Sequence, residues 1–293
     1  MTKRSKGEKI FAVFNTFLLI LLCFICVIPV WHVFMGSVSD PLILSASTGL
    51  IFWPLGKATW GGYRLILANS AILKSYLNTL LYVVAGTSIG LVLNTLAAFV
   101  MSRRGLMFGK AFNMFVLFTM IFNGGLVPTF IVINKLGLYD TRWAVILPGA
   151  LSAFNIIIMR TSFQEIPYEL QEAARIDGAS EFQLLTKIIL PVSKAIIAVI
   201  VLFYGIQHWN EWFQASIYLQ NRDLYPLQLV LREIVLQSTE NAIVADADGQ
   251  DVNIYRPLIK YATIVISIVP MMVIYPFVQK YFVSGVMIGS VKG

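Results

Sequence analysis

Residues 172–191 read EAARIDGASEFQLLTKIILP and lie in a long polar break between apolar segments. Pro167, just upstream, suits a first helical position because its missing N–H has no partner to lose there. Arg175 falls in the last turn of such a helix, where the helix dipole favours a positive charge. Gly178 can adopt the left-handed conformation that ends a helix. The pattern predicts a short helix followed by a glycine hinge.

A second short helix is expected after the hinge. Ser180 followed by Gln183 predicts a capping box at its start, and Pro191 is expected to end it before the next apolar run. Three apolar residues share one face of this helix at three- and four-residue spacings, namely Phe182, Leu185 and Ile189. We therefore expect a compact two-helix segment with an apolar face, suited to docking in a partner's groove.

The composition indicates a membrane protein. Of the 293 residues, 58% are hydrophobic and only 13% are charged, which is too apolar for a soluble domain of this length. The net charge of +7 could suggest a nucleic-acid partner, but the basic residues flank apolar runs, as in membrane topology signals, and no nucleic-acid module is present. No nucleotide-binding loop and no serine–histidine or metal constellation occurs, so the chain is not expected to be an enzyme.

The apolar runs predict an all-α integral membrane protein with six transmembrane helices. The expected spans are about 10–34, 76–101, 111–134, 143–159, 192–213 and 257–281. Lys and Arg are more frequent in the short segments beside one set of span ends, which places both termini and the loop 160–191 in the cytoplasm. The segment 218–256 is then a long external loop.

Two spans carry unusual residues. The third contains Asn123-Gly124-Gly125 and Pro128, and broken backbone at membrane depth is tolerated only against protein or a water-filled path. It is either a packing kink or a break that lines a pathway. Polar residues of the second span predict a helix packed inside a bundle, and they are Asn78, Ser88, Asn94 and Thr95.

The spacing of the central loop is also a motif. Glu-Ala-Ala, three residues, Gly178, nine residues and Ile188-x-Leu190-Pro191 together resemble the coupling loop of permease subunits in ABC importers. An ordinary amphipathic loop in another six-span protein is the alternative. The runs NGGLVPTFIVINKLGLYDTRWAVILPGALSAFNIIIMR, HWNEW and QKYFVSGVMIGSVKG are similar to permeases of carbohydrate ABC importers. The overall pattern resembles the second permease subunit of the maltose type, in the subgroup associated with larger or acidic oligosaccharides such as alginate fragments.

The resemblance implies a type I ABC importer permease fold and a multi-pass protein of the inner membrane. It also implies three protein partners: a second, non-identical permease, a dimer of ABC ATPases that holds ATP and Mg, and a periplasmic solute-binding protein. The chain itself then needs no cofactor. The residues carried over to ATPase coupling are Glu172, Ala173, Ala174, Arg175, Asp177, Gly178, Leu190 and Pro191. Glu172 is expected to be the polar anchor, and the small residues to permit close approach.

A candidate sugar path lies toward the outer end of the fifth span. Stacking rings beside amide and carboxylate groups suit a sugar, which offers apolar C–H faces and hydroxyls. The residues are His208, Trp209, Asn210 and Glu211, next to Trp212, with Phe154 and Asn155 of the fourth span proposed on the same grounds. An interfacial aromatic belt with the polar groups satisfied between helices is the equal alternative.

No metal site is expected. Asp246, Asp248 and Asp251 of the external loop do not have the spacing of an EF-hand. Cys23 and Cys26 lie in an apolar run without the further ligands that zinc needs. The resemblance gives the external loop another role, reaching into the cleft of the binding protein.

The resulting prediction is a permease subunit that translocates an oligosaccharide with energy from separate ATPase subunits. The alternative is an ion- or proton-coupled secondary transporter, which needs intramembrane carboxylates or inverted repeats that the sequence does not show. A membrane-embedded sensor that uses the central loop as a docking site is a third hypothesis.

Overall fold

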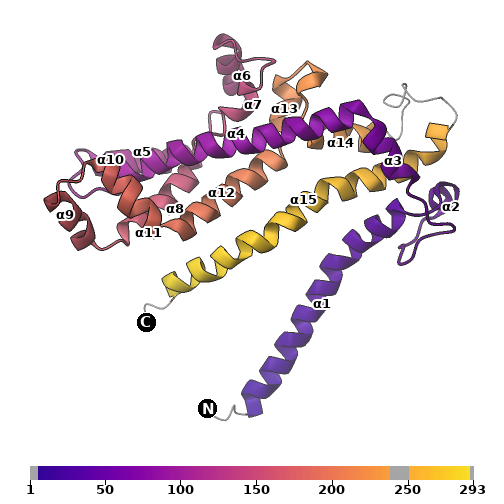
Figure 1. The fold of residues 1–293 in the computed structure, drawn as a ribbon, viewed down its shortest axis with the longest axis horizontal. Helices are drawn as coiled ribbons and strands as arrows, with labels where there is room; N and C mark the ends of the chain where they lie inside the picture. Colours follow the sequence, from indigo (N-terminus) through magenta and orange to yellow (C-terminus); the bar gives the residue numbers. More distant parts are fainter. Residues whose placement is uncertain (1–5, 238–250, 291–293) are drawn as a thin grey trace. The chain divides into compact units, whose positions relative to one another are not determined.

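The computed structural model describes residues 6–237 and 251–290, and every regular element within them is helical (Figure 1). The chain forms two compact units, which are described separately. One consists of Met1–Ser70 with Glu233–Val269, and the other of Ala71–Arg232 with Pro270–Gly293.

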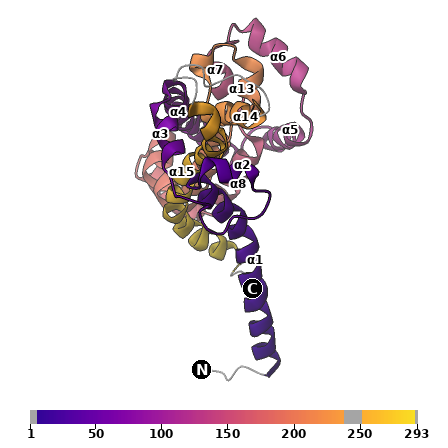
Figure 2. The same cartoon turned by 90° about the vertical axis from the view of Figure 1, so that its right-hand side faces the viewer.

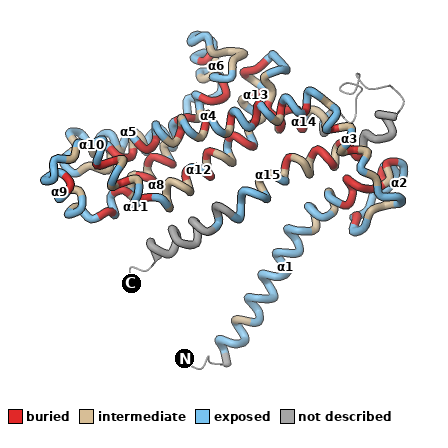
Figure 3. The backbone as a smooth tube through the Cα atoms, in the orientation of Figure 1, coloured by how far each residue is buried: buried red, intermediate tan, exposed pale blue. Residues whose placement is uncertain are grey.

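The first unit contains α1 (Lys6–Ser37), α2 (Pro41–Ala46), α3 (Gly61–Ala68) and the beginning of α15 (Asp251–Ser290). Its small core consists of Met35, Leu44, Ile51 and Leu258. The apolar side chains along most of α1 are exposed (Figure 3). An apolar helix of this length with so little buried surface is suited to lipid.

The second unit is organised around α4 (Ser70–Met101) and α12 (Lys194–Trp209). Two glycines one helical turn apart, Gly86 and Gly90, allow the helices to approach closely. A Cβ on Gly90 would lie 2.8 Å from Cζ of Tyr204 on α12. Such small-xxx-small pairs are typical of helix packing in membranes, where close van der Waals contact replaces the hydrophobic drive.

Three of the four polar residues expected inside the bundle are buried on α4, namely Asn78, Asn94 and Thr95. The prediction is wrong for Ser88, which is exposed. Ser88 is two residues from both Gly86 and Gly90, so it lies on the opposite side of the helix from their buried face.

The third predicted span is broken where the sequence indicated. Helix α5 (Gly109–Ile121) and helix α6 (Leu126–Lys135) meet at an angle of 109° (Figure 2). Gly125 has a φ of +89°, a conformation that glycine adopts readily, and its N–H donates to Oδ1 of Asn123 at 3.0 Å. Pro128 lies in the first turn of α6, where no intrahelical donor is lost.

The fourth predicted span, 143–159, is not one continuous helix. It consists of α7 (Trp143–Ile146), a non-helical stretch at 147–152, and α8 (Ala153–Gln164), which continues beyond the predicted end. Pro148 and Gly149 lie in the interruption, and both disfavour a continuous helix. The cytoplasmic loop predicted from residue 160 therefore begins inside α8.

The coupling segment is helical almost throughout. It contains α9 (Tyr168–Ile176), α10 (Glu181–Leu184), the π-helix η1 (Leu185–Ile189) and α11 (Leu190–Val192). Pro191 lies within α11, so it does not end the helix as predicted; the chain instead turns by 86° at Ser193 before α12. The π-turn precedes the proline, where the amide of Leu190 donates to the carbonyl of Leu185.

The predicted external loop, 218–256, also contains helices. They are η2 (Arg222–Leu224) and α14 (Leu227–Gln237), which follow α13 (Phe213–Tyr218), and α15 begins at Asp251. Asp246 and Asp248 lie outside the described residues.

Three described helices are long and apolar enough to cross a membrane: Gly7–Ser37, Ser70–Met101 and Pro257–Pro276. The number rises to five if each of the two bent helix pairs forms one span. The chain is therefore an all-helical protein with several candidate spans. The count of six remains a prediction, and it depends on whether the interrupted segment 143–159 crosses the membrane.

Candidate coupling and translocation site

The glycine hinge has the geometry that the sequence predicted. Gly178 has a φ of +82°. The amide of Ala179 donates to the carbonyl of Ala174 at 2.9 Å, and that of Gly178 to Arg175 at 3.0 Å. This pair of bonds is a Schellman motif, which ends α9 and turns the chain toward α10.

Both flanking caps are ordered. Ser180 accepts from the amide of Gln183 while the Gln183 side chain accepts from the amide of Ser180, so the predicted capping box is confirmed. At the other end Pro167 is the N-cap of α9, one position before the predicted one, with a ψ of 132°. The two helices of the coupling segment therefore have a defined local geometry.

The apolar face predicted for docking is divided in the structure. Phe182 is 69% exposed, but Leu185 and Ile189 are buried together with Leu184, so the prediction of one docking face made by all three residues is wrong for Leu185 and Ile189. Helix α10 is only four residues long, too short for a hydrophobic period to define which of its sides faces the core. The inward side chains share one core cluster with α4, α8 and α12, in which the largest members are Phe99, Met159, Phe163 and Tyr204.

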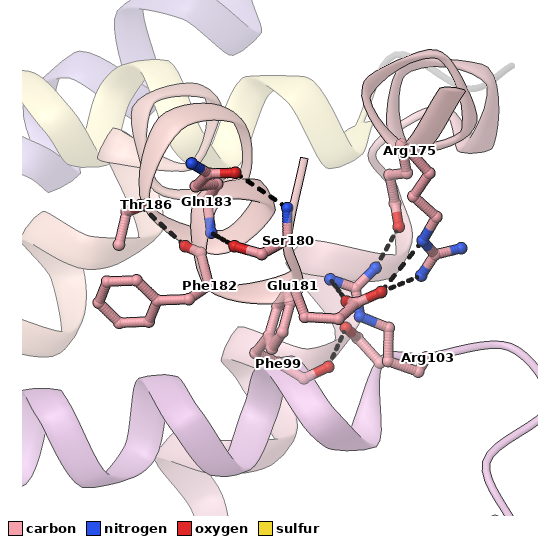
Figure 4. A network of polar contacts seen from close by, with 10 residues as sticks. Phe99, Arg103, Arg175, Ser180, Glu181, Phe182, Gln183 and Thr186 are labelled. Atoms are coloured by element: carbon pink, nitrogen blue, oxygen red, sulfur yellow. Dashed lines mark hydrogen bonds and ion pairs between the residues drawn. The ribbon is translucent and has the colours of Figure 1, made fainter. Parts of the chain in front are cut away.

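An ionic clamp that the sequence alone did not predict joins the end of α4 to the coupling segment (Figure 4). Glu181 accepts two bonds from Arg175, at 2.9 and 3.1 Å, and lies 3.3 Å from Nη2 of Arg103. Arg103 also donates to Oε1 of Gln171 at 2.6 Å and packs over the ring of Phe99, 3.7 Å from its centroid. Burial lowers the pKa of Arg103, and the carboxylate of Glu181 opposes that shift.

The outward side of the coupling segment is exposed in the described part of the chain. The exposed members include Glu172, Ala173, Asp177 and Gly178, together with the large apolar side chain of Ile176, which is 81% exposed. Glu172 makes no side-chain hydrogen bond or ion pair within the described part of the chain. Of the other predicted coupling residues, Pro191 is exposed, Leu190 is half-buried, Ala174 is buried and Arg175 belongs to the clamp.

The predicted sugar-path residues divide into an inward and an outward group. His208 is 1% exposed and lies against Gly86, with its ring stacked on Tyr204 at a centroid distance of 6.3 Å. Trp209 is buried edge-on to Tyr76, with centroids 5.9 Å apart. Both side chains therefore pack within the second unit.

The outward group is smaller. Asn210 and Phe154 are exposed, and Glu211 is half-buried. Oε1 of Glu211 accepts the amide of Gln214 at 2.8 Å, which helps to begin α13. Asn155 is buried, and its backbone N–H donates to Oγ of Ser152 at the start of α8.

A cation–π contact ties α14 to the tryptophan that follows this group. The guanidinium carbon of Arg232 lies 3.5 Å from the ring centroid of Trp212. The two residues are far apart in the sequence, so the pairing could not be predicted from local spacing. It places the Arg232 guanidinium against the ring of Trp212, two residues after Asn210 in the sequence.

Asn94 is the polar hub of the unit. It is fully buried, and its Nδ2 donates to the carbonyl of Ala150 at 2.8 Å and to the hydroxyl of Tyr204, while its Oδ1 accepts the amide of Ser152 at 3.2 Å. The non-helical stretch 147–152 leaves backbone groups that need partners at this depth. Asn94 supplies them.

Replacing Asn94 by leucine should destabilise the protein by about 1–2 kcal/mol, because the backbone groups of the interruption lose their buried partners. The measurement is thermal unfolding of the purified protein in detergent. The control is Asn134→Leu, at an exposed site on α6, which should leave the unfolding temperature nearly unchanged. Equal effects of the two substitutions would contradict the role of Asn94.

No group of three or more His, Cys, Asp or Glu side chains that could hold a metal ion occurs in residues 6–237 and 251–290.

Comparison with known proteins places the chain in a family. The family model described as "Binding-protein-dependent transport system inner membrane component" matches residues 100–288. The "Polygalacturonan/rhamnogalacturonan transport system permease protein YtcP" of Bacillus subtilis (strain 168) is 38% identical over 282 residues, which cover 94% of this chain and 96% of YtcP. "Protein LplC" of the same organism is 36% identical, covering 99% of this chain and 97% of its own length.

Two solved structures of ABC transporters are similar to this chain. A chain in the crystal structure of a bacterial ABC transporter involved in the import of the acidic polysaccharide alginate has a TM-score of 0.86 and 30% identity, covering 96% of this chain and 100% of that one. A chain in a bacterial alginate ABC transporter crystallised with a periplasmic protein bound to alginate pentasaccharide has a TM-score of 0.63 and 16% identity, which shows the shared fold alone. It covers 92% of this chain and 93% of that one.

The matched region contains the coupling segment, its hinge and its clamp, and relatives of nearly the same length are transport permeases. The chain therefore belongs to the family of binding-protein-dependent transport system inner membrane components, the membrane permeases of ABC importers, as the coupling-loop motif predicted.

Proposed function

We propose that this chain is one permease subunit of a binding-protein-dependent ABC importer that moves an acidic oligosaccharide across the inner membrane. It spans the membrane six times, with both termini and the coupling segment in the cytoplasm. A second, non-identical permease completes the pathway. A dimer of ATPase subunits binds and hydrolyses ATP with Mg, and a periplasmic solute-binding protein delivers the sugar.

The observation that carries the proposal is the contrast between the two sides of the coupling segment. Its inner side is anchored by the core cluster and by Arg103, Glu181 and Arg175. Its outer side presents Ile176 and Phe182, which no other described residue covers. An exposed apolar pair on short, capped helices, with carboxylates beside it, fits insertion into a partner's groove.

Movement of the ATPases reaches the membrane helices through this anchoring. Because α10, η1 and α11 are continuous and turn directly into α12 at Ser193, displacement of the coupling segment moves α12 without an intervening flexible loop. ATP binding closes the ATPase dimer, brings the coupling segments together and opens the cavity outward, and hydrolysis resets it. Tight packing favours such discrete, collective shifts over gradual deformation.

The substrate class is supported by the relatives and by the exposed end of α12. YtcP carries polygalacturonan and rhamnogalacturonan in its name, and the 30%-identical structure belongs to an alginate importer; these are acidic polysaccharides. Asn210 and Glu211 offer hydrogen-bonding groups to sugar hydroxyls, and Phe154 offers an apolar ring. Arg232 supplies a positive charge for carboxylates. His208 and Trp209 then support the site from behind.

Reconstitution tests the proposal. In proteoliposomes containing the complete complex, we expect ATP hydrolysis to be stimulated severalfold only when the binding protein and an acidic oligosaccharide are both present. The matched neutral oligosaccharide of equal length serves as control. Stimulation by the neutral sugar alone would reject the acidic class. Sugar uptake driven by an ion gradient without an associated ATPase would favour the secondary-transporter alternative.

A further inference from the structure

The second unit contains a pocket of about 240 Å³ where the end of α4 meets α8 and α9. Its lining includes Arg103 and Arg104 from the turn after α4, and Tyr168, Gln171 and Arg175 from α9. Gln164 at the end of α8 completes the polar wall. No carboxylate belongs to this lining, so three guanidinium groups surround a space that holds no negative charge of its own.

Glu181 only partly balances these charges. It pairs with Arg175 and Arg103 from outside the pocket, which leaves Arg104 without a carboxylate partner within the described residues. Nε and Nη2 of Arg103 are enclosed and hydrogen-bond to no described atom, although Nη2 lies 3.3 Å from Glu181. Enclosed guanidinium donors without acceptors are costly, and an anion in the pocket would supply the missing acceptors.

The side chains are already oriented for such a ligand. The guanidinium carbon of Arg104 lies 4.7 Å from the ring centroid of Tyr168, and that of Arg103 lies 3.7 Å from the centroid of Phe99. Stacked guanidinium groups retain their N–H edges for an acceptor, and planar forks match the oxygens of a phosphate. Both aromatic contacts therefore hold the arginines near the pocket without consuming their donors.

The pocket lies at one end of an apolar helix. Arg103 and Arg104 follow α4, which ends at Met101, after one intervening residue. Exposed apolar side chains lie on both sides of the turn, including Val100, Met107 and Phe108. Basic pockets beside the cytoplasmic ends of membrane helices are suited to anionic head groups.

We propose that this pocket binds a phosphate group, supplied either by an anionic phospholipid at the cytoplasmic surface or by a free phosphate compound. The cavity is larger than the phosphate itself and accommodates the polar part of a head group. Its arginines come from both the α4 turn and α9, so the bound anion bridges α4 to the coupling segment. The cytoplasmic placement of the pocket and the regulatory consequence, that occupancy stabilises the link through which the ATPases act, rest on the function proposed above; the binding measured below does not.

The test is a lipid titration of the purified, delipidated complex followed by native mass spectrometry, without ATP. Phosphatidylglycerol is the anionic probe and phosphatidylcholine the zwitterionic one. Arg104→Gln is the test variant because the Arg104 side chain is exposed and outside the Glu181 clamp. Lys110→Gln, at an exposed position on α5, is the matched control for loss of one positive charge.

We expect Arg104→Gln to weaken phosphatidylglycerol binding about fivefold to tenfold, as for loss of one charge-assisted contact, and Lys110→Gln to leave it within twofold. Competition by inorganic phosphate or glycerol 3-phosphate, with the same sensitivity to Arg104→Gln, would identify a soluble source instead of the lipid. Equal binding by the wild type and both variants, for lipid and for free phosphate, would overturn the proposal. Since no nucleotide is present, this result would leave the coupling role of Glu172–Pro191 untouched, and loss of coupling would leave the lipid titration unchanged.

Discussion

Replacing Gly178 by leucine should abolish sugar-stimulated ATP hydrolysis and uptake while the protein still inserts in the membrane. Gly178 has a φ of +82°, and a Cβ at this position meets no atom of the chain within 4 Å. The substitution therefore causes no internal clash and adds backbone strain of roughly 1–2 kcal/mol. The larger effect comes from the partner: a bulky side chain on the exposed hinge blocks close approach of the ATPase.

The control for backbone strain is Gly137→Leu. Gly137 also has a positive φ, +69°, and also has open space around its Cβ position. It follows α6, in a turn expected on the external side, so the same strain occurs there without an ATPase contact. Uptake by proteoliposomes should fall at least tenfold for Gly178→Leu and change little for Gly137→Leu. Normal uptake by the Gly178→Leu variant would contradict the coupling role. Equal losses of uptake in the Gly178→Leu and Gly137→Leu variants would assign the effect to backbone strain.

Gly86→Ala should destabilise the protein by about 3 kcal/mol, at the upper end of overpacking effects. The new methyl group would lie 2.2 Å from Nε2 of His208, far inside van der Waals contact. His208 is 1% exposed and stacked on Tyr204, so its ring has no room to move away. The measurement is thermal unfolding in detergent, in which the unfolding temperature should drop by several degrees.

Two variants separate this clash from a general effect of alanine in a membrane helix. Gly205→Ala on α12 has no atom within 4 Å of the added Cβ, and it should be neutral or stabilising by up to about 1 kcal/mol. His208→Ala combined with Gly86→Ala removes the ring that the methyl group meets, so the double variant should be more stable than the sum of the single effects. Strict additivity would show that the two residues do not interact.

The sequence was informative wherever a local pattern sufficed. The capping box of Ser180 and Gln183, the left-handed Gly178 and the break before α6 each depend on residues within a few positions of one another, and all three are present in the structure. The motif from Glu172 to Pro191 predicted the family correctly for the same reason, since it also depends only on residues close together in the sequence. The burial of Leu185 and Ile189 was missed because the sequence grouped them with the exposed Phe182 on one face, and only packing decides which apolar side chains of so short a helical stretch turn inward.

The interrupted fourth span shows a different limit. Hydropathy alone counted 143–159 as one helix, but hydropathy does not record whether backbone groups find partners elsewhere. Asn94, more than fifty residues away, bonds to both Ala150 and Ser152 and so permits a non-helical stretch there. A pattern search along the chain does not detect a partner at that separation.

The sequence by itself determined the class of this protein: its apolar runs indicate a lipid environment, and the spacing from Glu172 to Pro191 resembles that of ABC-importer permeases, the family to which the chain belongs. The tertiary structure decided what anchors that segment and what it leaves exposed. The clamp among Arg103, Arg175 and Glu181 and the contact of Gly86 with His208 join residues distant in the sequence. Such contacts depend on the three-dimensional approach of helices, and the energies of packing and charge pairing that select them act only once the chain is folded.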